Sequence, residues 1–125
     1  MGNLLIVMAG GAIGAGLRHL FGRWMFNAFG PGYPWGTLGV NLIGGLAMGL
    51  LVGVMARSGG NEQVRLALGV GVLGGFTTFS AFSLDMVTMI ERGAVASAIG
   101  YALVSVVGAA LALFAGLQLT RGVAA

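Results

Sequence analysis

The chain has 125 residues, of which 58% are hydrophobic and only 7% are charged, and its mean hydropathy is +0.99. Six arginines and three acidic residues cannot solvate the surface of a water-soluble domain, in which about 25% of residues are usually charged. We therefore expect an all-α integral membrane protein. Because no part of the chain remains for an aqueous domain, we expect no enzymatic activity.

Four stretches are apolar enough to cross a bilayer, which takes roughly 20 residues each. In chain order they are residues 3–26, 37–55, 63–90 and 95–119, and we expect one transmembrane domain over residues 1–125. Turn residues separate them: glycines, prolines and interfacial aromatic residues at 29–36, and polar or glycine-containing segments at 57–62 and 91–93.

Small residues recur at helix-packing spacing in every span. In lipid, helices associate by close approach of their backbones, so such stripes predict tightly packed faces. The stripes are Gly10 and Gly14; Gly45, Gly49 and Gly53; Gly71 and Gly75; and Ser105, Gly108 and Ala109.

The arginines are distributed almost evenly between the two membrane sides that four spans imply. One side has Arg57, Arg65 and Arg121, and the other has Arg23 and Arg92, with Arg18 deeper in the first span. This is almost no positive-inside bias, so the chain is expected to insert in both orientations. Two copies related by an in-plane two-fold axis would form an antiparallel homodimer, and four helices alone are too few to enclose a pathway comfortably.

The third span contains an unusual segment at residues 74–83, with two adjacent glycines, two threonines and two serines. This composition predicts a helix break near the middle of the span, and carbonyls freed there can coordinate a cation. Thr77, Ser80 and Ser83 form a polar stripe. Phe79 and Phe82 form a neighbouring aromatic ridge, and the positive edges of phenyl rings favour an anion. The competing interpretation is a kinked packing helix whose hydroxyls bond to carbonyls four residues earlier.

Other polar residues lie within apolar surroundings. Asn41, near Thr37, either donates to an anion or makes an interhelical hydrogen bond. Tyr101 and Ser105 share one face of the fourth span. These four positions are candidates for a polar pathway. Arg18 and Asp85 either pair with each other, or Arg18 snorkels and draws anions into a vestibule.

These features allow three functional classes. The first is a passive ion channel. The second is a small four-helix, proton-coupled exporter of cationic toxic compounds, which needs a membrane carboxylate, typically deep in the first span; that span has Arg18 and no acid, and Asp85 is the one candidate elsewhere. The third is a structural subunit of a membrane complex, which leaves Asn41 and the segment 74–83 without a purpose.

Three segments, residues 10–18, 36–42 and 74–83, resemble the Fluc (CrcB-type) fluoride channels, in order and at matching spacing over essentially the whole chain. The resemblance implies a dual-topology antiparallel homodimer with two pores. It would let fluoride leave the cell passively across the bacterial cytoplasmic (inner) membrane, as a multi-pass protein. The expected partners are fluoride, sodium, the lipid bilayer and a second copy, and not nucleic acid.

The resemblance also implies residue roles. A structural sodium ion would be held by the backbone carbonyls of Gly74 and Thr77, and Arg18 would lie at a vestibule. The fluoride pathway would include Asn41, Phe79, Phe82, Thr37, Ser80, Ser83, Tyr101 and Ser105. This chain has Ala109 where family members often have a further serine, which interrupts the expected track of hydroxyl groups.

Overall fold

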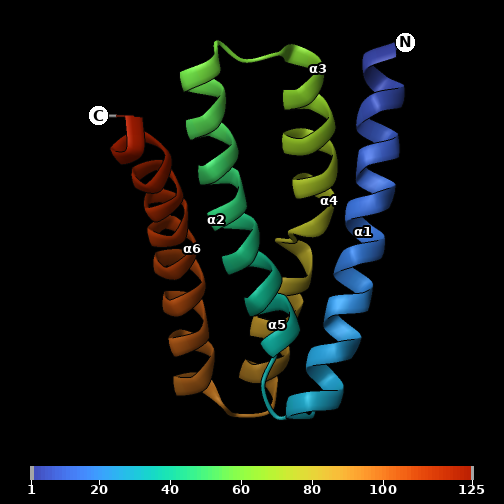
Figure 1. The fold of residues 1–125 in the computed structure, drawn as a ribbon. Coiled ribbons are helices and arrows are strands. Elements are labelled where there is room, and N and C mark those ends of the chain that lie inside the picture. Colours follow the sequence, from blue (N-terminus) through green and yellow to red (C-terminus); the bar gives the residue numbers. More distant parts are fainter. Residues whose placement is uncertain (1, 125) are drawn as a thin grey trace.

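The protein is a bundle of helices in the computed structural model, which describes residues 2–124 and the side chains of residues 2–120 (Figure 1). The long helices are α1 (Gly2–Phe29), α2 (Trp35–Ser58) and α6 (Val95–Ala124). The third span is assembled from α3 (Glu62–Val64), the π-helix η1 (Arg65–Leu73), α4 (Gly74–Phe76) and α5 (Ser80–Glu91). The side chain of Arg121, part of the predicted arginine balance, lies outside the described side chains.

Four stretches within residues 2–124 have the length and apolar composition to cross a membrane: Gly2–Phe29, Trp35–Ser58, Glu62–Glu91 and Val95–Thr120. This confirms the prediction of an all-α protein with four membrane spans. Successive spans run in opposite directions. The N-terminal end, the C-terminal end and the α2–α3 turn therefore lie at one end of the bundle, and the other two turns lie at the opposite end (Figure 1).

Glycines end the helices where the sequence predicts turns. The backbone φ is +78° at Gly30, +85° at Gly59 and +82° at Gly93, a left-handed region that other residues rarely adopt. Helix α3 begins at Glu62 and is capped by Asn61, whose Oδ1 accepts hydrogen bonds from the backbone N–H groups of Gln63 and Val64. The second turn is therefore held by its own polar residues.

Helix α1 packs against η1 and α4 through glycines. A Cβ atom on Gly10 would lie 2.6 Å from the carbonyl oxygen of Ala67, and one on Gly75 would lie 2.5 Å from the carbonyl oxygen of Gly11. A Cβ on Gly14 would collide with the carbonyl oxygen of Val72. The small-residue stripes of the first and third spans are thus tightly packed, as predicted, and they face each other.

Helices α2 and α6 make the other close pair. A Cβ on Gly45 would lie 2.8 Å from the carbonyl oxygen of Ala109, and one on Gly116 would lie 2.6 Å from that of Leu46. Near the end of the pair, the Thr120 side chain occupies the space beside Gly53. The glycine stripe of the second span therefore packs against α6.

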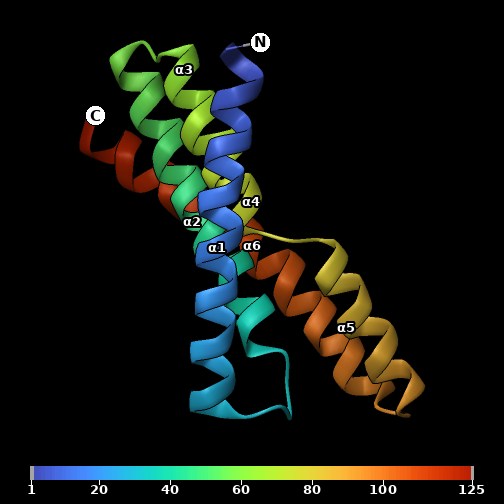
Figure 2. The same cartoon turned by 90° about the vertical axis from the view of Figure 1, so that its right-hand side faces the viewer.

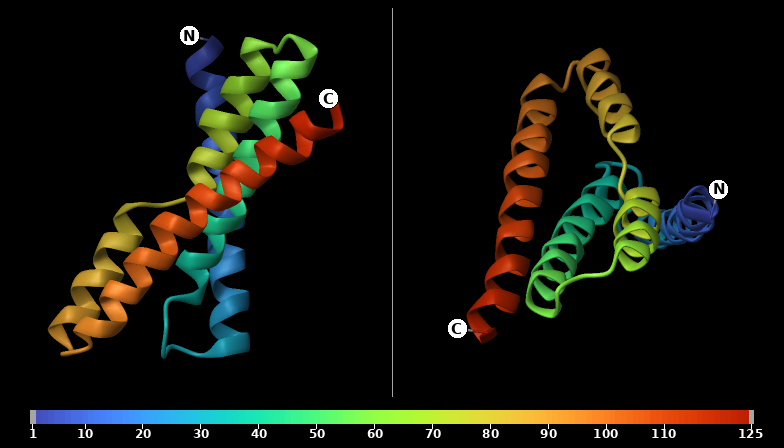
Figure 3. Two further views of the ribbon diagram at one scale, coloured as in Figure 1. Left: turned by 90° about the vertical axis from the view of Figure 1, so that its left-hand side faces the viewer. Right: turned by 90° about the horizontal axis from the view of Figure 1, so that it is seen from above.

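Beyond the middle of the bundle, the helices separate into two diverging pairs (Figures 2 and 3). Helix α5 lies along the first half of α6, whereas the adjoining halves of α1 and α2 stay together. The divergence starts at residues 77–79, between α4 and α5, where the third span changes direction. A buried cluster forms where α2, α5 and α6 meet: Leu38, Phe82, Met89, Ala98 and Tyr101.

Candidate functional site

The interruption of the third span lies at residues 77–79. Thr77 is extended, with φ −88° and ψ 163°, and α5 begins at Ser80. In a continuous α-helix, the N–H groups of Thr78 and Ala81 would donate to the carbonyls of Gly74 and Thr77. They donate instead to Oδ1 of Asn41, at 2.9 Å, and to Oγ1 of Thr78, at 3.1 Å. The carbonyls of Gly74 and Thr77 therefore lose their usual α-helical donors.

Asn41 connects α2 to this interruption by two hydrogen bonds. Its Nδ2 donates to the carbonyl oxygen of Thr78 at 3.0 Å, and its Oδ1 accepts from the N–H of Thr78 at 2.9 Å. A carboxamide has two N–H donors, so the second one is available to another acceptor. The two interpretations of Asn41 are therefore compatible: the same amide bonds another span and retains a donor.

The hydroxyl groups of the segment are used in different ways. Thr77 Oγ1 donates to the carbonyl of Leu73 and Ser83 Oγ to that of Phe79, both at 3.0 Å, which is the local bonding of the packing interpretation. Ser80 Oγ lies 3.4 Å from Thr78 Oγ1. The predicted polar stripe consists of Thr77, Ser80 and Ser83. Thr77 lines a groove, which the next paragraph describes, whereas Ser80 and Ser83 lie on α5 outside the groove lining.

A groove of about 480 Å³ gathers many of the predicted pathway residues from α2, α5, α6 and the interruption. Its lining includes Asn41, Gly74, Thr77, Phe79, Phe82 and Ser105. Ser105 is 6% exposed, and its Oγ has no hydrogen-bond partner among the described residues. A buried hydroxyl without a partner is costly, so this group is poised to bond whatever enters the groove.

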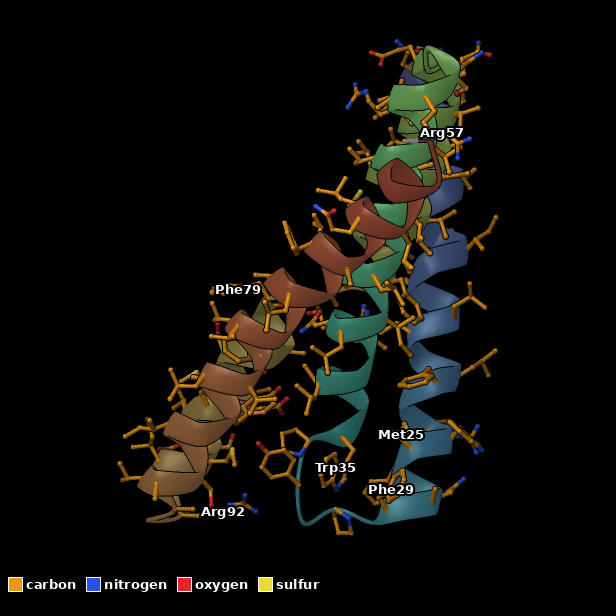
Figure 4. All side chains as sticks on the ribbon, turned by 60° about the vertical axis from the view of Figure 1, so that its left-hand side comes forward. Met25, Phe29, Trp35, Arg57, Phe79 and Arg92 are labelled. Atoms are coloured by element: carbon orange, nitrogen blue, oxygen red, sulfur yellow. The ribbon has the colours of Figure 1, made fainter. Side chains whose placement is uncertain are left out.

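The two phenylalanines of the predicted ridge differ in exposure. Their ring centroids are 5.5 Å apart, with 45° between the ring planes. Phe82 is 6% exposed and belongs to the buried cluster, whereas Phe79 is 76% exposed. Phe79 lies at the level of the interruption, on the side away from Met25 and Trp35 (Figure 4). One ring therefore forms the inner wall of the groove and the other its open edge.

A second pocket, of about 530 Å³, lies beside α1 and is basic. Arg18, His19, Arg23, Thr37 and Thr78 are among its lining residues. Arg18 Nε donates to the carbonyl oxygen of Gly75 at 3.2 Å, so this guanidinium faces the interruption rather than pairing with Asp85. Thr78 borders both this pocket and the groove. This basic pocket, which contains Arg18 where the sequence predicts a vestibule, and the groove therefore meet at Thr78.

Sequence reasoning missed Thr78 as a site residue. Its hydroxyl accepts from the N–H of Ala81 and so satisfies a free donor in the first turn of α5. In a helix cap, a threonine hydroxyl usually accepts a hydrogen bond from the N–H group three residues later. Thr78 and Ala81 have this spacing, so the cap could have been predicted from the sequence. The carbonyl of Thr78 also accepts from Asn41 Nδ2, and its N–H donates to Asn41 Oδ1.

Tyr101 and Asp85 form a polar pair deeper along α5 and α6. The Tyr101 side chain is fully buried, and its hydroxyl donates to Oδ2 of Asp85 at 3.1 Å. Asp85, Thr37 and Tyr33 border a third pocket, of about 330 Å³, near the α1–α2 turn. Thr37 thus borders both this pocket and the vestibule, which places the predicted residue between them.

Comparison with known proteins identifies the family. A family model described as CrcB-like protein, Camphor Resistance (CrcB), matches residues 5–117. A protein of Mesorhizobium japonicum named fluoride-specific ion channel FluC is 56% identical over 97% of this chain and 98% of its own length. Proteins with the same name from Sphingopyxis alaskensis and Phenylobacterium zucineum are 57% and 54% identical, over 97% and 98% of both chains respectively.

These matches cover nearly the whole chain at high identity, and they agree with the segments 10–18, 36–42 and 74–83 that resemble the Fluc channels. The relatives are named as ion channels, a class that is not enzymatic, which agrees with the expectation drawn from composition. The chain therefore belongs to the CrcB-like family of fluoride-specific ion channels.

Proposed function

We propose that this protein is a fluoride-selective channel that exports fluoride passively across the bacterial cytoplasmic membrane. The observation that carries the proposal is the groove at the interruption, which combines an amide donor, a free buried hydroxyl and two phenyl rings in a member of this family. Fluoride is small and strongly hydrated, so a selective path must replace its water with closely spaced neutral donors. A cationic side chain that reached into the groove would trap the ion.

The proposed path begins at the vestibule, where Arg18 raises the local anion concentration without entering the groove. From there the ion passes Thr37 and Thr78 to the second N–H of Asn41 and the hydroxyl of Ser105. The edges of Phe79 and Phe82 stabilise it electrostatically. Further hydroxyls on α5 and α6 complete the path: Ser80, Ser83 and Tyr101.

Two copies of the chain, in opposite orientations, are proposed to make the complete channel with two pores. Phe79 is 76% exposed at the open edge of the groove, so one subunit alone leaves this wall incomplete. The nearly even arginine distribution supports insertion in both directions. A second antiparallel subunit would cover the open edge and supply the missing wall.

A structural sodium ion is proposed at the interruption, held by the carbonyl oxygens of Gly74 and Thr77. The donor set fits, because both carbonyls have lost their α-helical donors to side chains, and unwound carbonyls are suitable ligands for sodium. The ion would neutralise the negative ends of these carbonyl dipoles. The chain's own contribution is to hold the Thr77–Thr78 peptide through Asn41 and to bond the N–H of Ala81 to Thr78 Oγ1.

Fluoride efflux from liposomes containing the purified protein, followed with a fluoride electrode, tests the proposal. We expect efflux of fluoride and not of chloride, and loss of efflux in Phe79→Ile and Phe82→Ile. Phe114→Ile is the matched control, because Phe114 is a 57% exposed ring on α6 outside the groove lining. Equal chloride efflux, or undiminished fluoride efflux in both groove variants, would contradict the proposed channel function.

The alternative function, proton-coupled export, is disfavoured because the candidate carboxylate, Asp85, accepts a hydrogen bond from Tyr101.

A further inference from the structure

A row of aromatic rings extends from the interruption to the α1–α2 turn. Phe82 lies 5.1 Å from Tyr101 between ring centroids, and Tyr101 lies 5.6 Å from Tyr33, with 86° between the ring planes. Tyr33 in turn lies 4.8 Å from Trp35. The ring of Tyr101 is therefore held between a ring of α5 on one side and a ring of the turn on the other.

Tyr33 also joins two parts of the molecule that otherwise diverge. It belongs to the turn between α1 and α2, whereas Tyr101 and Asp85 belong to the other pair of helices, α6 and α5. Figures 2 and 3 show how far α5 and α6 depart from α1 and α2 in this half of the bundle. The edge-to-face contact of Tyr33 with Tyr101 connects the α1–α2 turn to α6.

Tyr33 lies at a functional position as well as a packed one. It borders the pocket of about 330 Å³ that also has Thr37 and Asp85 in its lining, and Thr37 borders the vestibule as well. Burial raises the pKa of Tyr33 above its usual value, so this residue adds no charge to the pocket near neutral pH. The pocket thus has a neutral aromatic wall beside the Tyr101–Asp85 pair.

We propose that Tyr33 is a positioning residue for Tyr101, beside the pocket that shares Thr37 with the vestibule of the proposed ion path. Its ring holds the Tyr101 ring in the orientation in which the hydroxyl reaches Asp85, and this keeps the pocket open between Thr37 and the end of the bundle. The inference rests on the proposed channel function. In this proposal the aromatic ring of Tyr33, and not its hydroxyl, positions Tyr101.

Fluoride efflux from liposomes of four variants tests this role. Tyr33→Leu removes the edge-to-face contact with Tyr101. It lowers the rate of fluoride efflux by about fivefold, because loss of one aromatic pair reduces the population of correctly oriented Tyr101 rings by about that factor. Tyr33→Phe keeps the ring and restores most of the rate. In a Tyr101→Phe background, which removes the bond to Asp85, Tyr33→Leu has little additional effect. The matched control is Phe114→Leu, because Phe114 is a 57% exposed ring on α6 outside this pocket.

The outcomes separate this inference from the proposed function. Absence of fluoride efflux in the unmodified protein overturns both. Efflux in the unmodified protein with an equal rate in Tyr33→Leu overturns the role of Tyr33 alone. An equal loss of efflux in Tyr33→Phe and Tyr33→Leu assigns the effect to the hydroxyl and refutes the ring argument. If Tyr33→Leu lowers the efflux rate by the same factor in the Tyr101→Phe background, Tyr33 does not act by positioning Tyr101. Tyr33→Met repeats the comparison if Tyr33→Leu does not yield monodisperse protein.

Discussion

Replacement of Asn41 by leucine tests what holds the interrupted segment of the third span. Leucine has a similar volume but cannot make either hydrogen bond to Thr78. The N–H of Thr78 would then lose its partner in a partly buried position, and the carbonyl of the same residue would lose a donor. We expect residues 77–79 to open much more often while the glycine-packed helices remain intact.

The size of the effect follows from the two bonds. A hydrogen bond contributes about 1 kcal/mol net, and a buried group left unpaired costs about 1–3 kcal/mol. Opening of the segment should become easier by about 2–3 kcal/mol, which corresponds to a roughly 30- to 150-fold larger open population. Because the segment is not fully buried, the lower end of this range is the expected value.

Hydrogen–deuterium exchange measured by mass spectrometry reports this population directly. Peptides covering residues 77–81 should exchange about 30-fold faster in Asn41→Leu, whereas peptides from the α2–α6 contact should be unchanged. Asn27→Leu is the matched control, since Asn27 is an exposed amide on α1. Unchanged protection of residues 77–81 in Asn41→Leu would refute the argument that Asn41 holds the segment.

Three further outcomes are expected. Gly14→Ala should lower the Tm, because the added Cβ meets the carbonyl of Val72 at a cost of about 1–3 kcal/mol. Gly16→Ala should leave the Tm unchanged, because the space around Gly16 is open. Equal Tm values for the two variants would contradict the described packing of α1. Ser105→Ala loses no protein hydrogen bond, so the Tm should stay the same while fluoride efflux falls about tenfold, the effect of one hydrogen bond. Arg18→Gln should reduce efflux at low ionic strength and much less above about 0.15 M salt, because attraction by an accessible charge is screened; a salt-independent loss would exclude recruitment.

Much of the fold could be predicted because hydropathy and small-residue spacing are local properties of the sequence. The four spans and the contacts of Gly10, Gly14 and Gly45 follow from them. The π-helical hydrogen bonding of residues 65–73 could not be predicted, because one added residue per turn leaves the apolar composition unchanged. That Asn41 bonds Thr78 depends on how α2 is rotated against the third span.

The site was predictable by residue type more than by partner. An amide in the second span and hydroxyls in the third indicated a polar path, but the sequence left open whether Arg18 pairs with Asp85. In the structure Arg18 bonds the Gly75 carbonyl and Asp85 accepts from Tyr101. These choices depend on which helices neighbour each other near the interruption, which is a property of the tertiary packing.

The way the interruption satisfies its backbone explains how an anion can pass close to it. The N–H of Thr78 and that of Ala81 are bonded by neutral oxygens of Asn41 and Thr78. No carboxylate takes part, so the free donors are satisfied without placing a negative charge beside the groove. The acid in the same span, Asp85, is bonded to Tyr101 instead. The proposed anion path therefore has neutral donors at the interruption, with no carboxylate bonded to the freed N–H groups.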